Sequence, residues 1–384
     1  MGMVAYILCI IYHNIIYYKG EIFMKKLALV LGSLLVVGSV ASAKEVMPAP
    51  VAEPEVKIVE KPVEVIVYRD RVVEAPAKWR PNGSLNIQYR WYGETENRVP
   101  GEKNSDWARG TNNYGRLQTE AKVNITENQK LEVRARNFHT LRTEKSKAPE
   151  DQLRLRHFYN FGNIADTKVN ATSRVEYNQK SNDGEKHIEA SVGFDFAQYL
   201  FNNDFIKTDS FVLRPRYKYT WEGHKDGSYT NTLGINLESA YTLPLGFSAE
   251  FNLYPQYVFA DEKFETNKGM KDKEFYMEME AYLYNSTELY KNGKFDVSFE
   301  FEGGYDPYSF HQYKLVENRN DNKERRDYSL YALPYLQANY QATEFVKLYA
   351  AAGAEYRNWK DSAESTASHW RWQPTAWAGM KVNF

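Results

Sequence analysis

Apolar and polar positions alternate along most of this chain, from Trp79 to Phe384. Between residues 116 and 125 the run RLQTEAKVNI places Leu, Thr, Ala, Val and Ile at every second position, with charged or amide side chains between them. The run FDVSFEFE at 295–302 does the same. Successive side chains of a β-strand point to opposite faces of a sheet, so this period predicts strands with one apolar and one polar face.

A soluble antiparallel sandwich alternates in the same way, so further features must separate it from a membrane barrel. Charged residues recur on the polar face in segment after segment, and each segment runs about ten residues or more, the length that a tilted strand needs to cross a bilayer. We count fourteen segments, centred near residues 88, 120, 134, 157, 173, 192, 216, 236, 253, 279, 300, 333, 350 and 377. Counts of twelve or sixteen stay open, because four prolines interrupt the predicted strands, where bulges or strand ends are expected. These prolines are Pro215, Pro255, Pro334 and Pro374.

The connections between the segments alternate in length. Short ones are expected at 126–129, 162–167, 201–209, 242–246, 287–293 and 341–344, and long polar ones at 94–114, 141–151, 261–272, 307–325 and 359–369. Short turns on one side and long loops on the other are typical of outer-membrane barrels. The sequence therefore predicts an all-β fold, a transmembrane antiparallel β-barrel of about fourteen strands with long extracellular loops and short periplasmic turns.

Composition narrows the function classes. Lys and Arg total 49 against 50 Asp and Glu, and this balance excludes a nucleic-acid binder that relies on a global basic field. The mean hydropathy is negative, which excludes a bundle of transmembrane helices. Aromatic residues make up 15% of the chain, with 30 Tyr and 20 Phe, as expected for strands that alternate between lipid and water.

The first part of the chain resembles an export signal. Residues 24–43 read MKKLALVLGSLLVVGSVASA, with a basic start, an apolar run and a small-residue cleavage site, so cleavage between Ala43 and Lys44 and export through the Sec pathway are expected. We interpret residues 1–23 as an upstream extension from a mis-assigned start, with a second hydrophobic anchor as the alternative. Removal of the signal would also remove Cys9, the only cysteine.

Residues 44–78 carry five prolines among Val, Glu and Lys. Proline at this density blocks a continuous helix and favours an extended chain, so we expect a periplasmic linker. The stretch 63–73 alternates well enough for one strand, so a small folded element or a plug is the alternative. The barrel is then expected to occupy residues 79–384, ending in Phe384, a terminal aromatic that resembles the signal read by the barrel-assembly machinery.

The polar face is expected to line a pore. Its predicted basic residues are Arg90, Arg116, Lys122, Arg134, Arg136, Arg154, Arg156, Arg174, Arg214, Arg216 and Lys218. Its predicted acidic residues are Glu238, Glu250, Glu278, Glu280, Asp296, Glu300 and Glu302. The two sets are expected on different walls, with a field between them; solvated polar surface without a directed role is the alternative. About eight strands already give an interior that side chains fill, so a larger ring must hold water, a loop or a plug.

Patterns for catalysis and metal binding are absent from the sequence. No two histidines have the i, i+3 or i, i+4 spacing of a metal site, and there is no HExxH or GxSxG motif. We therefore expect no enzyme activity, no metal and no cofactor.

Longer motifs resemble a known family. They are WRPNGS and QYRWYGE within 79–94, RLRHFYNFG at 154–162, KVNATSRVEY at 168–177, EGGYDPYSFHQYK at 302–314, FVKLYAAAGAEYRN at 345–358 and RWQPTAWAGMKVNF at 371–384. With the signal sequence, these stretches resemble the FomA family, the major outer-membrane porins of fusobacteria. The resemblance implies a homotrimeric, voltage-gated general-diffusion porin in outer-membrane lipid, with a further role in adhesion to surface ligands of other cells.

The sequence thus predicts a weakly selective channel for small hydrophilic solutes and ions in the outer membrane. The alternative is a surface adhesin or structural anchor with an occluded lumen. A substrate-specific channel is a third hypothesis, for which the sequence names no ligand.

Overall fold

The computed structural model describes residues 79–96, 111–141, 148–181, 184–223, 227–266, 268–313, 315–316, 322–323, 328–360 and 370–384. The predictions for the upstream extension at 1–23, the signal at 24–43 with its Ala43–Lys44 junction and the linker at 44–78 lie outside the described residues. No helix among the described residues is long and apolar enough to span a membrane.

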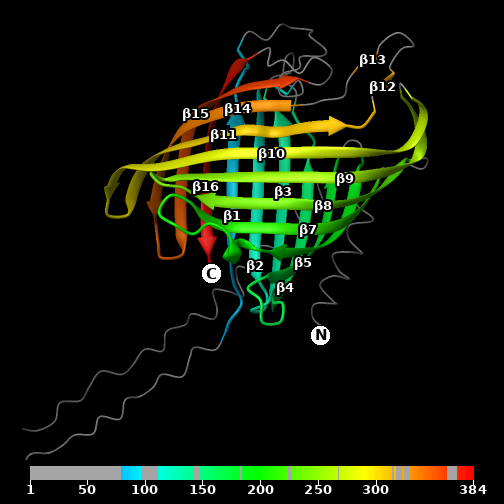
Figure 1. Cartoon of the computed structure of the whole chain (residues 1–384). Helices are drawn as coiled ribbons and strands as arrows, with labels where there is room; N and C mark the ends of the chain where they lie inside the picture. The colour runs from blue at the N-terminus through cyan, green and yellow to red at the C-terminus, as the bar shows by residue number, and fades with distance from the viewer. Residues whose placement is uncertain are drawn as a thin grey trace, which may run out of the picture. The chain divides into compact units, whose positions relative to one another are not determined.

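The described part of the chain forms one antiparallel sheet closed into a ring (Figure 1). Its long strands are β1 (Asn82–Tyr92), β2 (Tyr114–Asn124), β3 (Gln129–Thr140), β4 (Gln152–Asn163), β5 (Asn170–Lys180), β6 (Lys186–Asp195), β7 (Lys207–Trp221), β8 (Tyr229–Thr242), β9 (Phe247–Thr266), β10 (Gly269–Asn292), β11 (Phe295–His311), β14 (Tyr328–Gln341), β15 (Val346–Lys360) and β16 (Arg371–Asn383). Each pairs with the next in chain order, and β1 pairs with β16 to close the ring. Figure 1 shows β10 on the near wall and β3 on the far wall.

Two further strands are short and stand outside the ring. β12 (Leu315–Val316) and β13 (Asn322–Lys323) pair with each other, and β12 adds to the end of β9 through Leu315 and Thr266. Among the described residues the ring therefore has fourteen strands. Each of the fourteen predicted segment centres falls inside one ring strand, so the predicted fold class is confirmed.

Some predicted boundaries are wrong. The long loop expected at 261–272 is instead a strand hairpin, because β9 continues to Thr266 and β10 begins at Gly269, with Met270 opposite Glu265. Apart from Phe264 and Met270 the residues of this hairpin are polar or Gly, so the sequence gives no alternating signal although the backbone groups pair. The turn expected at 287–293 is also strand as far as Asn292; a bulge between Glu288 and Tyr290 shifts the alternation there.

The other connections keep the expected asymmetry with shifted ends. Short connections span 125–128, 164–169, 243–246 and 342–345, and the longest on that side, 196–206, holds the 3-10 turn η3 (Ala197–Tyr199). Several expected connections begin or end inside strands; for example, β7 begins at Lys207, β11 ends at His311 and β15 ends at Lys360. Strands of a barrel extend past the membrane, where polar residues replace the alternating pattern.

The prolines sit in the strands without the expected bulges. At Pro334 the β14–β15 ladder pairs Ala332 with Tyr356 and resumes at Tyr335 with Gly353, in the same register. The β6–β7 ladder at Pro215 and the β8–β9 ladder at Pro255 also open for two pairs and resume in register. Each of these prolines keeps its ladder on the other side, which limits the loss from its missing N–H. Pro374 follows the expectation and lies where β1 no longer pairs with β16.

Beside two of these prolines, the neighbouring strand has a glycine where the two backbones come close together. A Cβ on Gly353 would lie 2.3 Å from the carbonyl oxygen of Pro334. A Cβ on Gly234 would lie 2.8 Å from the carbonyl oxygen of Pro255. Both distances are below contact, so a side chain at either position would push the neighbouring strands apart.

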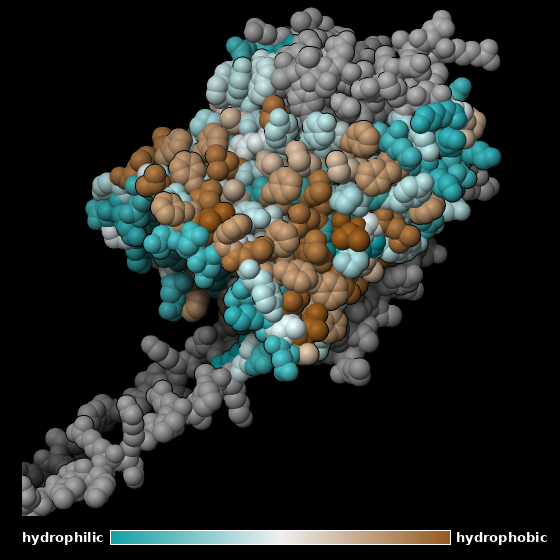
Figure 2. Space-filling view, viewed as in Figure 1, coloured by the Kyte–Doolittle hydropathy of each residue, from teal (hydrophilic) through white to brown (hydrophobic). Residues whose placement is uncertain are grey.

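The outward face of the ring is apolar. Figure 2 shows hydrophobic residues gathered over the middle of the near wall, with hydrophilic residues towards its ends. Large exposed side chains of this kind include Val175, Ile188, Leu213, Tyr217, Leu233, Ile235, Phe251, Leu283 and Leu336. An apolar band between polar ends is the surface that a barrel presents to lipid.

Candidate functional site: the inner face of the barrel

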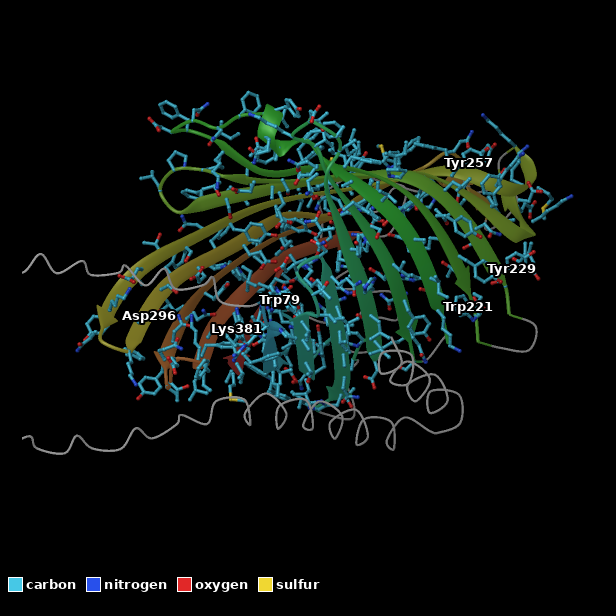
Figure 3. The ribbon with its side chains drawn as sticks, turned by 90° about the horizontal axis from the view of Figure 1, so that it is seen from below. Trp79, Trp221, Tyr229, Tyr257, Asp296 and Lys381 are labelled. Atoms are coloured by element: carbon cyan, nitrogen blue, oxygen red, sulfur yellow. The ribbon has the colours of Figure 1, made fainter. Side chains whose placement is uncertain are left out.

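The side chains that alternate with the apolar band point into the ring. Figure 3 shows the strands from below with their side chains, among them Asp296 of β11 and Lys381 of β16. Two hollows lie along this inner face. One, of about 530 Å³, is lined by β1, β2, β11 and β14 to β16, and the other, of about 740 Å³, is lined by β4 to β10.

The structure places most of the predicted pore-lining residues in these hollows. The first contains Arg90, Arg116, Lys122 and Glu302. The second contains Arg156, Arg174, Arg216, Lys218, Glu238, Glu250, Glu278 and Glu280. The remaining ones share the inner face through their cross-strand neighbours or side-chain contacts, namely Arg134, Arg136, Arg154, Arg214, Asp296 and Glu300.

Strands β5 to β8 carry a lattice of ion pairs. Arg174 lies 2.9 Å from Glu189 and 3.2 Å from Glu238. Arg216 lies 2.7 Å from Glu189, and Arg214 lies 3.1 Å from Glu238. Each arginine of this lattice is thus held by a carboxylate of a nearby strand, which satisfies the charge and fixes the guanidinium in place.

This lattice corrects the expected separation of charges. The predicted basic residues Arg174 and Arg214 contact the predicted acidic residue Glu238, so these members of the two sets share one wall. Two acidic residues beside these arginines, Glu176 and Glu189, were not predicted; Glu176 pairs with Arg156 and lies 3.2 Å from His187. Both glutamates occupy the polar positions of their alternating segments, as the arginines do. This alternation could have identified them from the sequence.

Strands β1 to β4 carry arginines of a different kind. Five of them have no ion pair with any carboxylate among the described residues: Arg90, Arg116, Arg134, Arg136 and Arg154. Their partners are neutral. Arg116 donates to Gln88 at 3.1 Å and Arg136 donates to Gln118 at 2.8 Å.

Aromatic rings hold one member of this group. The Arg90 guanidinium lies 4.5 Å from the ring centroid of Trp377 and 4.6 Å from that of Tyr92, and it donates to Thr375 at 2.9 Å. Cation–π contact of this kind attracts the cation without neutralising it. Arg90 is also directly opposite Arg116 in the β1–β2 ladder. Like charges that face each other are destabilising unless water or other charge screens them.

Strands β9 to β11 carry the acidic residues, and neutral donors surround them. Glu280 accepts a hydrogen bond from Tyr254 at 3.0 Å, and Asp296 accepts one from Asn339 at 2.7 Å. Glu302 accepts from the Tyr331 hydroxyl, while Glu300 accepts from Ser298 at 2.7 Å. These tyrosine partners were not predicted; nothing in the strand pattern separates a tyrosine of the inner face from one that faces lipid.

Position around the ring sets the electrostatics of the lumen. In a ring of fourteen strands, β3 and β10 are seven strands apart in both directions, so they occupy opposite walls. The unpaired arginines on β2 to β4 therefore face the strands β9 to β11 across the lumen, with the ion-pair lattice of β5 to β8 between them on one side, while Glu302 shares a hollow with Arg90 and Arg116. This arrangement can orient a dipolar solute and can interact with ions of either sign.

Phe384 completes the seam that closes the ring. Its backbone N–H donates to the Gly83 carbonyl oxygen at 3.0 Å, and the Gly83 N–H donates to the Phe384 oxygen at 2.7 Å. The side chain of Phe384 is 45% exposed, so it is accessible on the side of the short turns.

No group of His, Cys, Asp and Glu side chains able to hold a metal occurs among the described residues.

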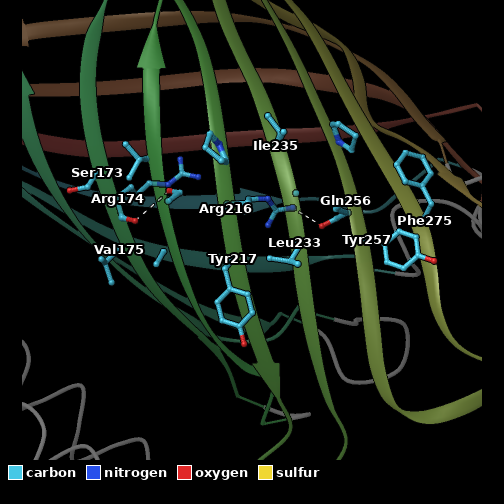
Figure 4. A pocket seen from close by; sticks show the side chains of 16 residues that line it. Ser173, Arg174, Val175, Arg216, Tyr217, Leu233, Ile235, Gln256, Tyr257 and Phe275 are labelled. Atoms are coloured by element: carbon cyan, nitrogen blue, oxygen red, sulfur yellow. Dashed lines mark hydrogen bonds between the residues drawn. The ribbon is translucent and has the colours of Figure 1, made fainter. Parts of the chain in front are cut away.

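The outer face has a hollow of its own, shown in Figure 4. Its volume is about 860 Å³, and Pro215 and Pro255 lie in its floor where the two ladders open. Apolar side chains such as Val175, Leu233 and Ile235 surround it. Arg174, Arg216 and Gln256 also line this hollow, so it borders the ion-pair lattice through the wall of the sheet.

Comparisons with known proteins give no close relative. No protein-family model matches the sequence, and no curated protein matches it. Among solved structures, a "bacterial polysaccharide outer membrane secretin" matches with a TM-score of 0.37 and 11% identity, covering 79% of this chain and 98% of that chain. The outer membrane channel DcaP of Acinetobacter baumannii matches with a TM-score of 0.31 and 9% identity, covering 79% and 96%. The NanC porin matches with a TM-score of 0.31 and 8% identity, covering 79% and 100%. Likenesses this distant carry no conclusion about this chain, and the barrel is established by its own strand pairing.

Proposed function

We propose that this chain is an outer-membrane channel that lets small hydrophilic solutes and ions diffuse through a water-filled lumen. One observation carries the proposal: charged side chains without counter-charges line opposite walls of the ring. Unpaired charges on a protein interior are tolerated beside water or mobile ions, and are very costly in a dry interior. The lumen therefore needs water and ions to be stable.

The size of the ring supports the same function. About eight strands already enclose an interior that side chains fill, and this ring has fourteen. The inner face is hollowed by about 530 Å³ on one side and about 740 Å³ on the other. Solutes would be limited mainly by size, and selectivity between cations and anions would be weak because both signs of charge line the path.

The membrane is inferred from several features. The apolar outer band fits lipid, the signal at 24–43 fits Sec export, and the terminal Phe384 fits recognition by the barrel-assembly machinery. Together these support a place in the outer membrane of a Gram-negative type of cell.

The resemblance to FomA-type porins supports finer properties of the same channel. It implies a homotrimer, voltage gating and a role in adhesion to other cells. We propose the trimer and the gating together with the channel. The test is chemical cross-linking of the folded protein, which should give a trimer, combined with stepwise closure of single channels at raised voltage.

Conductance across a planar lipid bilayer tests the channel itself. Purified, refolded protein should insert in discrete steps, and step size should rise in proportion to bulk salt conductivity, as for a water-filled path. Heat-modifiable mobility on gels should first confirm that the barrel is folded. Folded protein that gives no conductance steps would contradict the proposal and favour the adhesin or anchor with an occluded lumen.

A further inference from the structure

Four arginines of the inner face form a cluster on three neighbouring strands. Arg116 lies on β2, Arg134 and Arg136 on β3, and Arg154 on β4. Arg134 and Arg154 are direct partners in the β3–β4 ladder. Arg136 repels Arg116 electrostatically, and Arg154 repels both arginines of β3. We call these four residues the arginine cluster.

No carboxylate of the described residues forms an ion pair with the arginine cluster, although Glu120, Glu132 and Glu176 are near enough to attract some of its members. Glu120 is the direct ladder partner of Arg134, but its carboxylate lies 3.2 Å from Lys122 instead. Both hydrogen bonds from the cluster to side chains go to neutral glutamines. The Nε atoms of Arg116 and Arg134 are buried and have no hydrogen-bond partner. A buried guanidinium N–H without an acceptor is costly, and each such group in a folded protein calls for an explanation.

The neighbouring ion-pair lattice differs from the arginine cluster in its carboxylates, since the Nε atoms of Arg174 and Arg216 are likewise buried without a hydrogen-bond partner. The guanidinium groups of Arg174 and Arg216 each lie within 3 Å of a Glu189 oxygen. The arginine cluster has the same residue type on the same face of the same sheet but lacks that internal anion. An anionic solute in the lumen can supply the counter-charge that the arginine cluster lacks.

From this contrast, we infer that the arginine cluster is a binding subsite for small solutes that carry a compact multivalent oxyanion, such as a phosphate group. The inference rests on the proposed channel function and deepens it by naming a solute class. Guanidinium groups match phosphate through paired N–H donors, and bonds between charged partners are about twice as strong as neutral ones. A group with two negative charges fits better than chloride, because four neighbouring cations face it.

The opposite wall adds to the fit. Carboxylates of β9 to β11 repel the same anion, so a phosphate in the lumen is directed towards the arginine cluster. A neutral or cationic remainder of the solute would lie towards Glu280. The subsite would raise the local concentration of phosphorylated solutes and slow their passage, so transport would saturate.

Blockade of ion current by inorganic pyrophosphate tests the inference. The bath should hold about 0.1 M KCl at pH 8, where the Debye length is about 10 Å and charges on the wall are felt by the solute. Wild-type channels should show a saturable fall in chloride current. In R134Q/R154Q the half-blocking concentration should rise at least about tenfold, since each lost charged hydrogen bond is worth about 1.5 kcal/mol or more.

A matched control exists on the other side of the seam. Lys347 and Lys381 are also cations directly opposite each other, on β15 and β16, and both line an inner hollow. K347Q/K381Q removes the same charge from the lumen and should leave pyrophosphate block nearly unchanged. R134K/R154K keeps the charge but loses the planar fork, so it should fall between wild type and R134Q/R154Q.

Binding in detergent separates this inference from the channel proposal. Isothermal titration of pyrophosphate into refolded protein should give binding for wild type and loss of binding for R134Q/R154Q, whether or not the protein conducts. A conducting channel without saturable block or pyrophosphate binding would overturn the subsite and leave the channel intact. A block that depends on Lys347 and Lys381 instead of the arginines would also overturn it.

Discussion

Arg134 on β3 and Glu280 on β10 lie on opposite walls of the barrel, seven strands apart in either direction around the ring. Arg134 has no ion pair among the described residues, and Glu280 accepts hydrogen bonds only from neutral groups, Tyr254 and Asn252. Each charge is therefore left to interact across the lumen with water, ions and solutes. The channel proposal depends on this relationship.

The acidic wall should favour cations in the lumen. Replacing Glu250, Glu280 and Glu302 together by Gln removes three negative charges from β9 to β11 without changing side-chain size. The reversal potential under a KCl gradient should then shift towards that of an anion-selective channel. Glu288, half-exposed at the short-turn end of β10 and paired with Lys291, provides the control, since E288Q should leave the reversal potential unchanged. An unchanged reversal potential in the triple variant would show that these carboxylates lie away from the ion path.

The ion-pair lattice should stabilise the barrel. Glu189 holds Arg174 and Arg216 and is 9% exposed, so E189Q leaves two arginines without their carboxylate. We expect a loss of about 2 to 3 kcal/mol in the free energy of unfolding, measured by urea titration of the folded protein in lipid vesicles. E185Q is the matched control, because the exposed pair of Glu185 with Lys180 is worth about 1 kcal/mol or less. Equal effects of both variants would contradict a structural role for the lattice.

Phe384 should matter for assembly more than for the folded state. Its backbone closes the seam with Gly83, but its exposed ring is free for recognition on the short-turn side. Removal of Phe384 should lower the amount of heat-modifiable barrel in outer-membrane fractions, while F384Y should preserve it. An unchanged amount of heat-modifiable barrel for the truncated chain at native expression would contradict the assembly role.

The proline-rich segment should act as a linker only. Deletion of residues 45–78 keeps the Ala43–Lys44 junction, and single-channel conductance should stay at the wild-type value. A large rise in conductance on deletion would identify the segment as a plug of the lumen.

How far the sequence predicts this fold depends on the face that each residue occupies. Alternation located all fourteen ring strands, because a lipid-facing side chain must be apolar wherever the strand crosses the membrane. It failed at 261–272 and at 287–293, where β9 and β10 extend into water and only backbone pairing defines the strand. The bulges expected at the prolines were also not predictable in this way. The ladder opens at these prolines and resumes in the same register, so the alternation of apolar and polar residues does not change there.

For the candidate site, parity predicts which residues share a face but leaves their partners unknown. Arg174 and Glu238 are sixty-four positions apart, and their contact at 3.2 Å depends on how the side chains reach across β5 to β8. The sequence therefore predicted a basic and an acidic set on separate walls, and it missed that Arg174 and Arg214 contact Glu238 of the other set. The tyrosines that hold Glu280 and Glu302 lie beyond what parity can separate.

The reversal potential of a variant without the arginine cluster is the most direct test of the account. Replacing Arg116, Arg134, Arg136 and Arg154 by Gln removes four unpaired positive charges from one wall and leaves the ion-pair lattice intact. Under a KCl gradient near 0.1 M the reversal potential should shift towards that of a cation-selective channel, and the shift should shrink near 1 M, where the Debye length falls to about 3 Å. A folded, conducting variant that keeps the wild-type reversal potential at low salt would show that these arginines do not line the permeation path, and would contradict the account.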